Sequence, residues 1–161
     1  MAAYLFTWNP ARWNWPDLHD RIMEIKQHGY CRERWGCAAT TKIRTGDRAF
    51  LIKLGQEPRG IMASGWVAGE VYEDLHWDTD QHAQRKMARY VDVDWDTLLD
   101  PESDLFPRGW LTSPVYANMR WEPRASGARI PATVAEQLEQ DWAVFLTRPH
   151  THNGQLQTTS R

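Results

Sequence analysis

The chain has 161 residues, of which 42% are hydrophobic and 25% are charged, and its formal net charge is −2. This composition is typical of one ordinary globular domain and excludes fibrous, collagen-like and wholly disordered chains. The near-neutral charge argues against a protein that coats nucleic acid through bulk electrostatics, and no apolar run approaches the roughly 18 residues of a membrane span. We therefore expect a cytoplasmic protein with no membrane partner.

The N-terminal part of the chain predicts a strand followed by a helix. The aromatic run Ala3–Trp8 suits a buried strand, and Asn9-Pro10 then ends it. From Pro16 onward, apolar residues recur at helical spacing, and Gly29 supplies a helix end. We therefore expect one amphipathic helix of about three turns, followed by an irregular stretch.

The middle of the chain predicts a sheet that curls. Strand formers fill residues 48–54, and a long second strand is expected over residues 60–72. Gly65 and Gly69 interrupt that second strand, which predicts the bulges or bends that curl a sheet into a barrel. Residues 89–95 alternate between apolar and acidic side chains and predict a half-exposed strand.

The C-terminal part predicts a long loop, a helix and a tail. Residues 97–129 are rich in proline and read mostly as loop, with a further strand expected over residues 111–116. Thr133 and Glu136 match a capping box at the start of a helix. Residues 148–161 carry almost no apolar side chains. The predicted organisation is one domain over residues 1–147 and a flexible polar tail or linker over residues 148–161.

The sequence carries no motif of known catalytic or metal-binding chemistry. Glycine-rich phosphate loops, Gly-x-Ser-x-Gly and His-Glu-x-x-His are absent. The two cysteines, Cys31 and Cys37, do not form a structural zinc pattern, and we interpret them as free thiols. We therefore expect no catalytic residue, no metal and no cofactor.

Tryptophan is the unusual component, with ten residues in the chain. Trp95 and Trp142 fall on the apolar faces of a predicted strand and helix, which indicates core positions. Five others lie at or beyond the ends of predicted elements: Trp8, Trp13, Trp15, Trp35 and Trp77. Such rings either sandwich a planar base or cover the open end of a small barrel, and their positions alone leave both interpretations open.

Charge is segregated along the chain. Residues 31–60 hold seven lysines and arginines against three acids, whereas residues 70–106 hold three basic residues against eleven acids. A local basic surface on residues 31–60 would suit nucleic-acid phosphates despite the acidic total charge.

Several motifs occur in order between about residue 3 and residue 146. They are Tyr4–Trp15, Arg34–Ala38, Gly46–Gly55, Pro58–Gly65, His76-Trp77, Tyr90–Val93 and Ser126–Pro131. Taken together, these motifs resemble the EVE domain family, and in particular EVE domains fused ahead of HNH nucleases in bacterial modification-dependent restriction enzymes.

The resemblance implies an α+β fold of the PUA-like type, a small curved β-barrel flanked by helices. It also implies a non-catalytic reader that binds a flipped modified cytosine, 5-methyl or 5-hydroxymethyl, in an aromatic cage. The partners that it implies are double-stranded DNA with modified cytosine and an HNH nuclease domain or subunit. A YTH-like reader of modified RNA is the alternative, and a small enzyme that acts on a nucleotide is a third.

The family pattern suggests which residues bind the base. Trp35 corresponds by position to the cage tryptophan that follows the first helix, and the family often has Ser-Cys-Gly after it, where this chain has Gly36-Cys37-Ala38. The residues expected to bind the modified base are Trp35, Trp13, Trp15, Trp8, Trp77, Ser64 and Ser126. Those expected to contact phosphates are Lys42, Arg44, Arg59 and Arg34.

Overall fold

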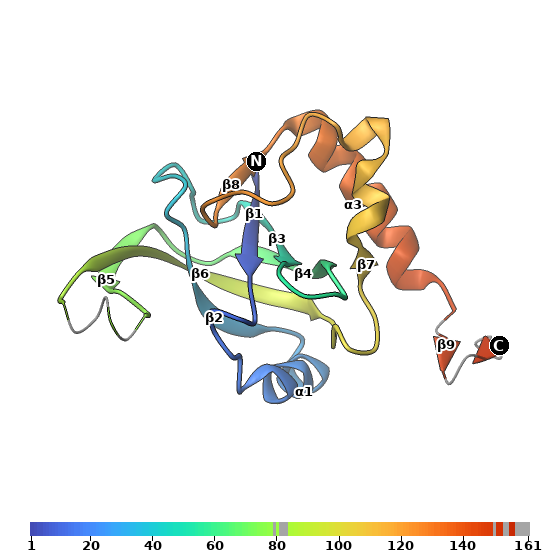
Figure 1. Cartoon of the computed structure of the whole chain (residues 1–161), viewed down its shortest axis with the longest axis horizontal. Helices are drawn as coiled ribbons and strands as arrows, with labels where there is room; N and C mark the ends of the chain where they lie inside the picture. The colour runs from blue at the N-terminus through green and yellow to red at the C-terminus, as the bar shows by residue number, and fades with distance from the viewer. Residues whose placement is uncertain (79, 81–83, 150, 153–154, 157–161) are drawn as a thin grey trace.

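The strands of the main sheet are ordered differently in space and in sequence. The structure is a computed structural model that describes residues 1–78, 80, 84–149, 151–152 and 155–156. The order in the sheet is β2-β6-β4-β3-β1-β8, with β5 paired to β6 and β7 paired to β4 (Figure 1). Strands β1 and β3 are parallel and the other neighbours are antiparallel. These strands are β1 (Ala3–Trp8), β2 (Cys31–Gly36), β3 (Arg48–Lys53), β4 (Gly60–Val67), β5 (Tyr72–Leu75), β6 (Met87–Leu98), β7 (Phe106–Pro107) and β8 (Ala128–Ile130).

The two ends of this sheet meet, so the sheet curls into a barrel. The indole of Trp35 in β2 donates to the carbonyl of Thr7 in β1 at 2.9 Å, although four strand pairings separate β2 from β1. Beyond β2, the amide of Ala39 donates to the carbonyl of Ser126 at 3.1 Å. The expected α+β class, a small curved barrel with flanking helices, is confirmed.

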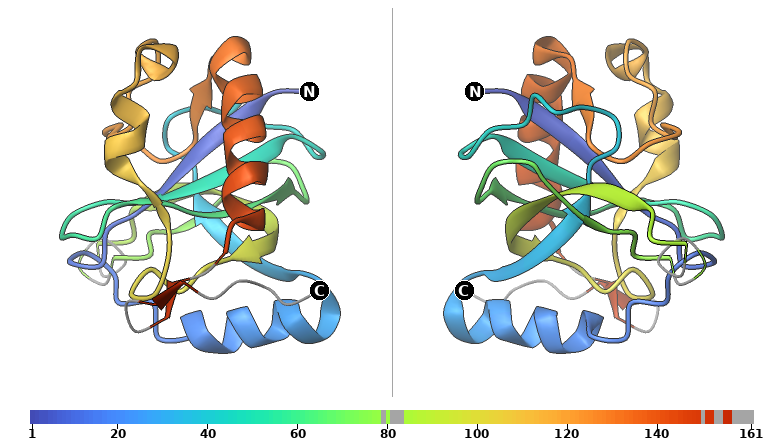
Figure 2. Two further views of the ribbon diagram at one scale, coloured as in Figure 1. Left: turned by 90° about the vertical axis from the view of Figure 1, so that its right-hand side faces the viewer. Right: turned by 90° about the vertical axis from the view of Figure 1, so that its left-hand side faces the viewer.

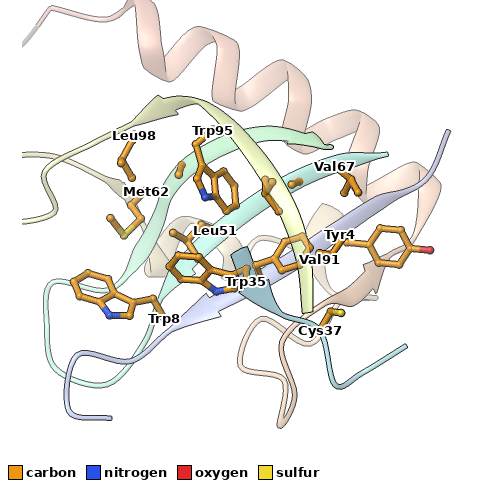
Figure 3. Close-up of a cluster of buried hydrophobic side chains, with 14 of the residues drawn as sticks. Tyr4, Trp8, Trp35, Cys37, Leu51, Met62, Val67, Val91, Trp95 and Leu98 are labelled. Atoms are coloured by element: carbon orange, nitrogen blue, oxygen red, sulfur yellow. The ribbon is translucent and has the colours of Figure 1, made fainter. Parts of the chain in front are cut away.

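The sheet separates two hydrophobic cores. Along β1, Tyr4, Phe6 and Trp8 point into the barrel, whereas Ala3 and Leu5 point out of it. We call the interior cluster the barrel core, and Figure 3 shows its Trp8, Trp35 and Trp95 side chains together. The cluster on the other face, which contains Trp142, is the outer core. The period of two in the strand thus supplies both cores at once.

Two helices cover different sides of the strands. Helix α1 (Leu18–His28) ends at Gly29 as predicted, with φ +88°, and it packs on the barrel core. Helix α3 (Ala132–Thr147) packs its buried stripe against the outer core. In Figures 1 and 2, α1 lies below the strands and α3 lies beside them on another side.

The capping box predicted for the last helix is wrong. The helix begins after Pro131, and no side chain caps it. Because the helix starts two residues earlier than the motif requires, Thr133 lies inside the first turn, where it cannot act as the N-cap. The predicted buried face is confirmed, and its members are Val134, Leu138, Trp142 and Phe145.

Strand boundaries differ from the prediction at two places. Residues 31–36, expected to be irregular, form β2, in which Cys31 and Trp35 are buried between exposed arginines. The long strand expected over residues 60–72 is two strands, β4 and β5, with Gly69 in the turn between them. Gly65 does mark a bulge: the register with β6 shifts there, and a Cβ would lie 2.1 Å from the carbonyl oxygen of Asp94.

The proline-rich segment forms short helices rather than the strand predicted over residues 111–116. It contains the 3-10 helices η1 (Arg108–Thr112) and η2 (Pro114–Tyr116), and strand β8 follows at Ala128–Ile130 without having been predicted. The Tyr116 hydroxyl bonds to the carboxylate of Asp141 in α3, so a helix and not a strand neighbour holds this segment.

Beyond α3, β9 (Thr151–His152) pairs with β10 (Gln155–Leu156). The rest of the predicted tail from residue 150 onward lies outside the described residues, so the domain boundary at residue 147 stays a prediction. None of the described helices combines the length and the apolar character needed to cross a membrane.

Candidate nucleic-acid interface

A cavity of about 680 Å³ opens where the two ends of the curled sheet meet. The ends of β1 and β3, strand β2, the start of β6 and the segment before β8 all contribute to its wall. We call it the tryptophan cavity, because Trp8, Trp13, Trp35 and Trp77 line it. Its volume lies within the range of about 300 to 1,000 Å³ that is typical of small-ligand sites.

Trp8 and Trp35 form fixed walls of the tryptophan cavity. Each is buried, and each indole N–H is already bonded: that of Trp8 to the carbonyl of Trp13 and that of Trp35 to the carbonyl of Thr7, both at 2.9 Å. Trp35 also meets Trp95 edge to face at 6.0 Å, which supports it from the barrel core. These two rings can therefore offer π surface to a ligand but no hydrogen-bond donor.

Trp13 is the accessible ring of this group, with 39% of the residue exposed. One face of Trp13 is stacked on Trp15 at 5.7 Å and 23°, and its edge meets Trp35 at 5.7 Å. Trp15 is 4% exposed, packs against Trp8 and Trp35, and does not line the cavity. The predicted site residue Trp15 therefore packs behind the tryptophans that line the cavity.

Other residues that line the cavity combine aromatic and cationic groups. Trp77 is also 39% exposed, and the guanidinium of Arg12 lies 5.8 Å from its ring centroid. The guanidinium of Arg34 lies 4.0 Å from the ring centroid of Tyr90 and forms an ion pair with Asp74 at 3.0 Å. These contacts place two arginines within π contact of rings that line the cavity.

The two serines predicted to bind the base lie in different places. Ser126 lines the cavity, and its Oγ accepts the amide of Thr7 at 3.1 Å, so its own proton is free to donate. Ser64 is 1% exposed and accepts the indole N–H of Trp142 at 2.9 Å. Because the alternation of β4 turns Ser64 toward α3, it lies in the outer region of the sheet and cannot reach the cavity.

The predicted phosphate contacts are dispersed. Arg34 lines the tryptophan cavity, whereas Lys42, Arg44 and Arg59 do not. Arg59 forms ion pairs with Glu57 at 2.8 Å and Glu122 at 3.0 Å. Lys42 is exposed and has no ion pair within the described part of the chain. Of the four, only Arg34 is placed at the cavity, and the phosphate contacts of the other three stay a prediction.

The basic segment over residues 31–60 and the acidic segment over residues 70–106 pair with one another in the folded protein. Cations of residues 31–60 meet acids of residues 70–106 as Arg32–Asp94 at 2.8 Å, Arg34–Asp74 at 3.0 Å and Arg44–Glu70 at 3.7 Å. Lys53 is buried and donates to the carbonyls of Gln56 and Pro58. The charge count along the sequence therefore overstates the positive potential of this segment.

The cavity contains cations that the sequence did not indicate. Arg12, Arg89 and Arg124 line it, and none of them has an ion pair with a described residue. Arg89 donates to the carbonyl of Ala38. Arg12 lies inside the aromatic motif at the N-terminus, which was the one available signal, whereas Arg89 lies in the segment over residues 70–106, in which acids outnumber bases, and Arg124 lies in the proline-rich segment.

Burial affects the pKa of one acid and one thiol near the tryptophan cavity, Glu33 and Cys37. Burial raises the pKa of Glu33, which lines the cavity and lies 3.1 Å from Arg21. Burial also raises the pKa of Cys37 to about 11, so this thiol stays protonated at neutral pH. Cys31 and Cys37 are free, as interpreted from the sequence, and both are buried. Over the described ranges, no three His, Cys, Asp or Glu side chains are grouped to hold a metal ion.

Comparisons with known proteins identify the fold. No protein-family model matches the sequence, and no curated protein is similar to it. A hypothetical protein from Leishmania major has a similar structure, with a TM-score of 0.63 at 12% identity, over 88% of this chain and 94% of that one. A protein from Rhodopseudomonas palustris is similar over 95% of this chain and 99% of its own, with a TM-score of 0.54 at 22% identity.

A third similar structure is that of the human THYN1 protein in complex with DNA containing 5-methylcytosine. The TM-score is 0.55 at 14% identity, over 87% of this chain and 96% of the human chain. At these identities the likeness establishes a shared fold across nearly the whole chain, and any shared function has to be argued from the site.

Proposed function

We propose that this protein reads modified cytosine in DNA by holding a flipped base in the tryptophan cavity. The observation that carries the proposal is the open aromatic wall: Trp8, Trp13 and Trp35 line one cavity at the seam of the sheet, and Trp13 keeps 39% of its surface exposed. The human protein with the same fold was solved in complex with DNA containing 5-methylcytosine, which supports a base of this class.

A base has to leave the duplex to use such a site. A cavity at the seam of the curled sheet can admit one extruded nucleotide but not a stacked base pair. Extrusion followed by aromatic stacking is how other proteins reach a single base. The Trp13 face that is not stacked on Trp15 is the surface on which we place the base. Stacking of this kind contributes about 1 to 3 kcal/mol per base.

Selectivity would come from the groups around the rings. Ser126 has a free hydroxyl proton, and Arg89 and Arg124 are cations without described ion partners. These groups suit the edge of the base and its phosphate. The indole walls suit the 5-methyl group, because burying one methyl-sized group in a fitted apolar site contributes about 1 kcal/mol or more.

The test is a titration by fluorescence anisotropy at one fixed salt concentration. Matched DNA duplexes would carry cytosine, 5-methylcytosine or 5-hydroxymethylcytosine at one position, and matched RNA would carry methylcytosine or methyladenine. We expect one modified DNA to bind about tenfold more tightly than the unmodified duplex. Equal affinity for modified and unmodified DNA contradicts the proposal, and tighter binding to modified RNA replaces it with a YTH-like RNA reader.

We further propose that the chain is the non-catalytic specificity domain of a cytoplasmic modification-dependent restriction system. The resemblance of its motifs to EVE domains that precede HNH nucleases supports this role, and cleavage would then belong to an HNH nuclease domain or subunit. Purified chain should leave modified plasmid intact in the presence of magnesium or manganese. Nicking that a point mutation in this chain abolishes would refute the non-catalytic assignment.

A further inference from the structure

A second hollow adjoins the tryptophan cavity. It has a volume of about 340 Å³ and is built mainly by residues 118–131, with Ala39 at one side. Pro123, Arg124 and Ala125 line both hollows, so the two are continuous along the surface. Nothing in the proposed base site uses the rest of this second hollow.

Three arginines line the second hollow: Arg120, Arg124 and Arg129. All three are exposed, and no described residue forms an ion pair with any of them. The one acid between residues 113 and 131 is Glu122, and it is already engaged by Arg59 at 3.0 Å and Arg108 at 3.5 Å. This segment is therefore positive in the folded protein, in contrast to residues 31–60. We call it the arginine groove.

The backbone beneath the arginine groove is held firmly. Trp121 is buried and its indole N–H donates to the carbonyl of Tyr116 at 3.2 Å, while Tyr116 itself bonds to Asp141 in α3. On the other side, Arg129 belongs to β8, which pairs with β1 opposite Tyr4. The backbone is thus held next to Arg120 and at Arg129, which lowers the ordering cost of binding.

We propose that the arginine groove binds the phosphates of the nucleotides next to the flipped base. This inference rests on the proposed function for the identity of the bound nucleic acid, but it concerns a surface other than the tryptophan cavity. Guanidinium groups match phosphate oxygens through paired N–H donors, and contacts to phosphates fix the register of a protein on nucleic acid without reading its sequence. Arg124 lines both hollows, so it lies where the DNA strand would pass from the tryptophan cavity into the arginine groove.

The experiment measures the salt dependence of binding for Arg120→Ala and Arg129→Ala, which lie in the arginine groove but not in the tryptophan cavity. The matched control is Arg32→Ala, which removes the same charge from an exposed arginine that is paired with both carboxylate oxygens of Asp94. Affinities would be measured between 50 and 200 mM salt with methylated and unmethylated duplexes. Thermal melting would confirm that each variant is folded.

Each groove variant should lower the slope of log affinity against log salt by about 0.9, which is about a 3.5-fold change in affinity across this range. The loss should be equal for methylated and unmethylated DNA, and Arg129→Lys should restore most of it. Arg32→Ala should leave the slope at the wild-type value.

The outcomes for the groove and for the base site differ. Slopes in Arg120→Ala and Arg129→Ala that match the Arg32→Ala slope overturn the groove, even if the wild-type protein prefers methylated DNA. Lowered slopes together with equal affinity for both duplexes support the groove and contradict the proposed base selectivity. Absence of binding to any duplex at 50 mM salt overturns both.

Discussion

Two tryptophans that are each stacked on another aromatic ring differ in how much of their surface is exposed. In the outer core, Trp142 is 2% exposed, is stacked on Phe145 at 5.6 Å, and meets Phe50 edge to face at 6.4 Å. At the barrel seam, Trp13 is stacked on Trp15 in the same manner but keeps 39% of its surface exposed. Trp142 is thus enclosed by its neighbours, whereas Trp13 keeps a ring face at a cavity.

This difference in exposure separates tryptophans that pack a core from tryptophans that can contact a ligand. Trp142 has neighbours on its ring and a hydrogen-bond acceptor, Ser64, for its indole N–H, so a ligand would have nothing to add. At the barrel seam, Trp15 packs against Trp13 and Trp95 packs against Trp35, and the ring of Trp13 still lines a cavity. A large exposed aromatic ring with a rigid support costs little to immobilise further on binding, which favours a recognition role.

The largest effect is expected from Trp142→Ala. Removing a buried Trp costs about 3 to 5 kcal/mol of unfolding free energy, and here it also leaves the Ser64 hydroxyl without its donor. Melting should fall by about 10 °C, while the ratio of affinities for methylated and unmethylated DNA at low temperature should not change.

If the alanine variant does not fold, Trp142→Phe keeps most of the volume and serves in its place. A changed affinity ratio in a folded Trp142 variant would mean that the outer core takes part in recognition and that the two clusters are not separate.

The next effect is expected from Trp13→Ala. Loss of a stacking face should weaken binding of the methylated duplex by about 1 to 3 kcal/mol and remove most of the preference for it. Melting should fall less than in Trp142→Ala, because 39% of Trp13 is exposed whereas Trp142 is 2% exposed. Anisotropy titration and thermal melting of the same preparation measure both quantities.

Trp35 is a poorer test, although it is the residue that the family pattern indicates most directly. It is 6% exposed, bonds to Thr7 and packs on Trp95, so Trp35→Ala would damage the barrel core as well as the cavity wall. Trp35→Phe keeps a π face, and partial discrimination by this variant would agree with stacking. Full discrimination by Trp13→Ala would show that the base does not lie on Trp13.

Local patterns were enough to predict most of the fold. Strand β1, helix α1 and the buried face of α3 follow from periodicity and from residues such as Gly29. Strand β2 could not be predicted in this way, because its edge position leaves charged residues on one face and its buried residues are stabilised by a distant partner, β6. Long-range pairing, and not local propensity, decides such a strand.

The site was harder to predict than the fold. The tryptophans were correctly chosen as unusual, but only the three-dimensional curl shows that Trp15 stands behind Trp13 and that Ser64 faces α3. The basic segment was misleading, because a count along the chain cannot show which acids fold against it, as Asp74 does against Arg34. The cavity arginines that form no ion pair with a described residue include Arg124, and no local sequence pattern marks it as a site residue.

The smallest and sharpest test compares the two serines predicted to bind the base. Ser64→Ala removes the acceptor of a buried indole N–H and should cost about 1 to 2 kcal/mol of unfolding free energy without changing DNA selectivity. Ser126→Ala should weaken binding of the methylated duplex by about 1 kcal/mol, because it removes a free hydroxyl donor from the cavity wall.

The Ser126 variant also takes an acceptor from the amide of Thr7, so stability alone cannot identify its role. Ser126→Thr retains the hydroxyl and should restore binding, whereas a purely structural serine would give the same affinity ratio in all three forms. If Ser64→Ala changed selectivity and Ser126→Ala did not, the base would lie on the α3 side of the sheet, and the assignment of the tryptophan cavity would be reversed. The pair therefore tests the location of the base with two substitutions of identical chemistry, one in the cavity wall and one on the side of the sheet that faces α3.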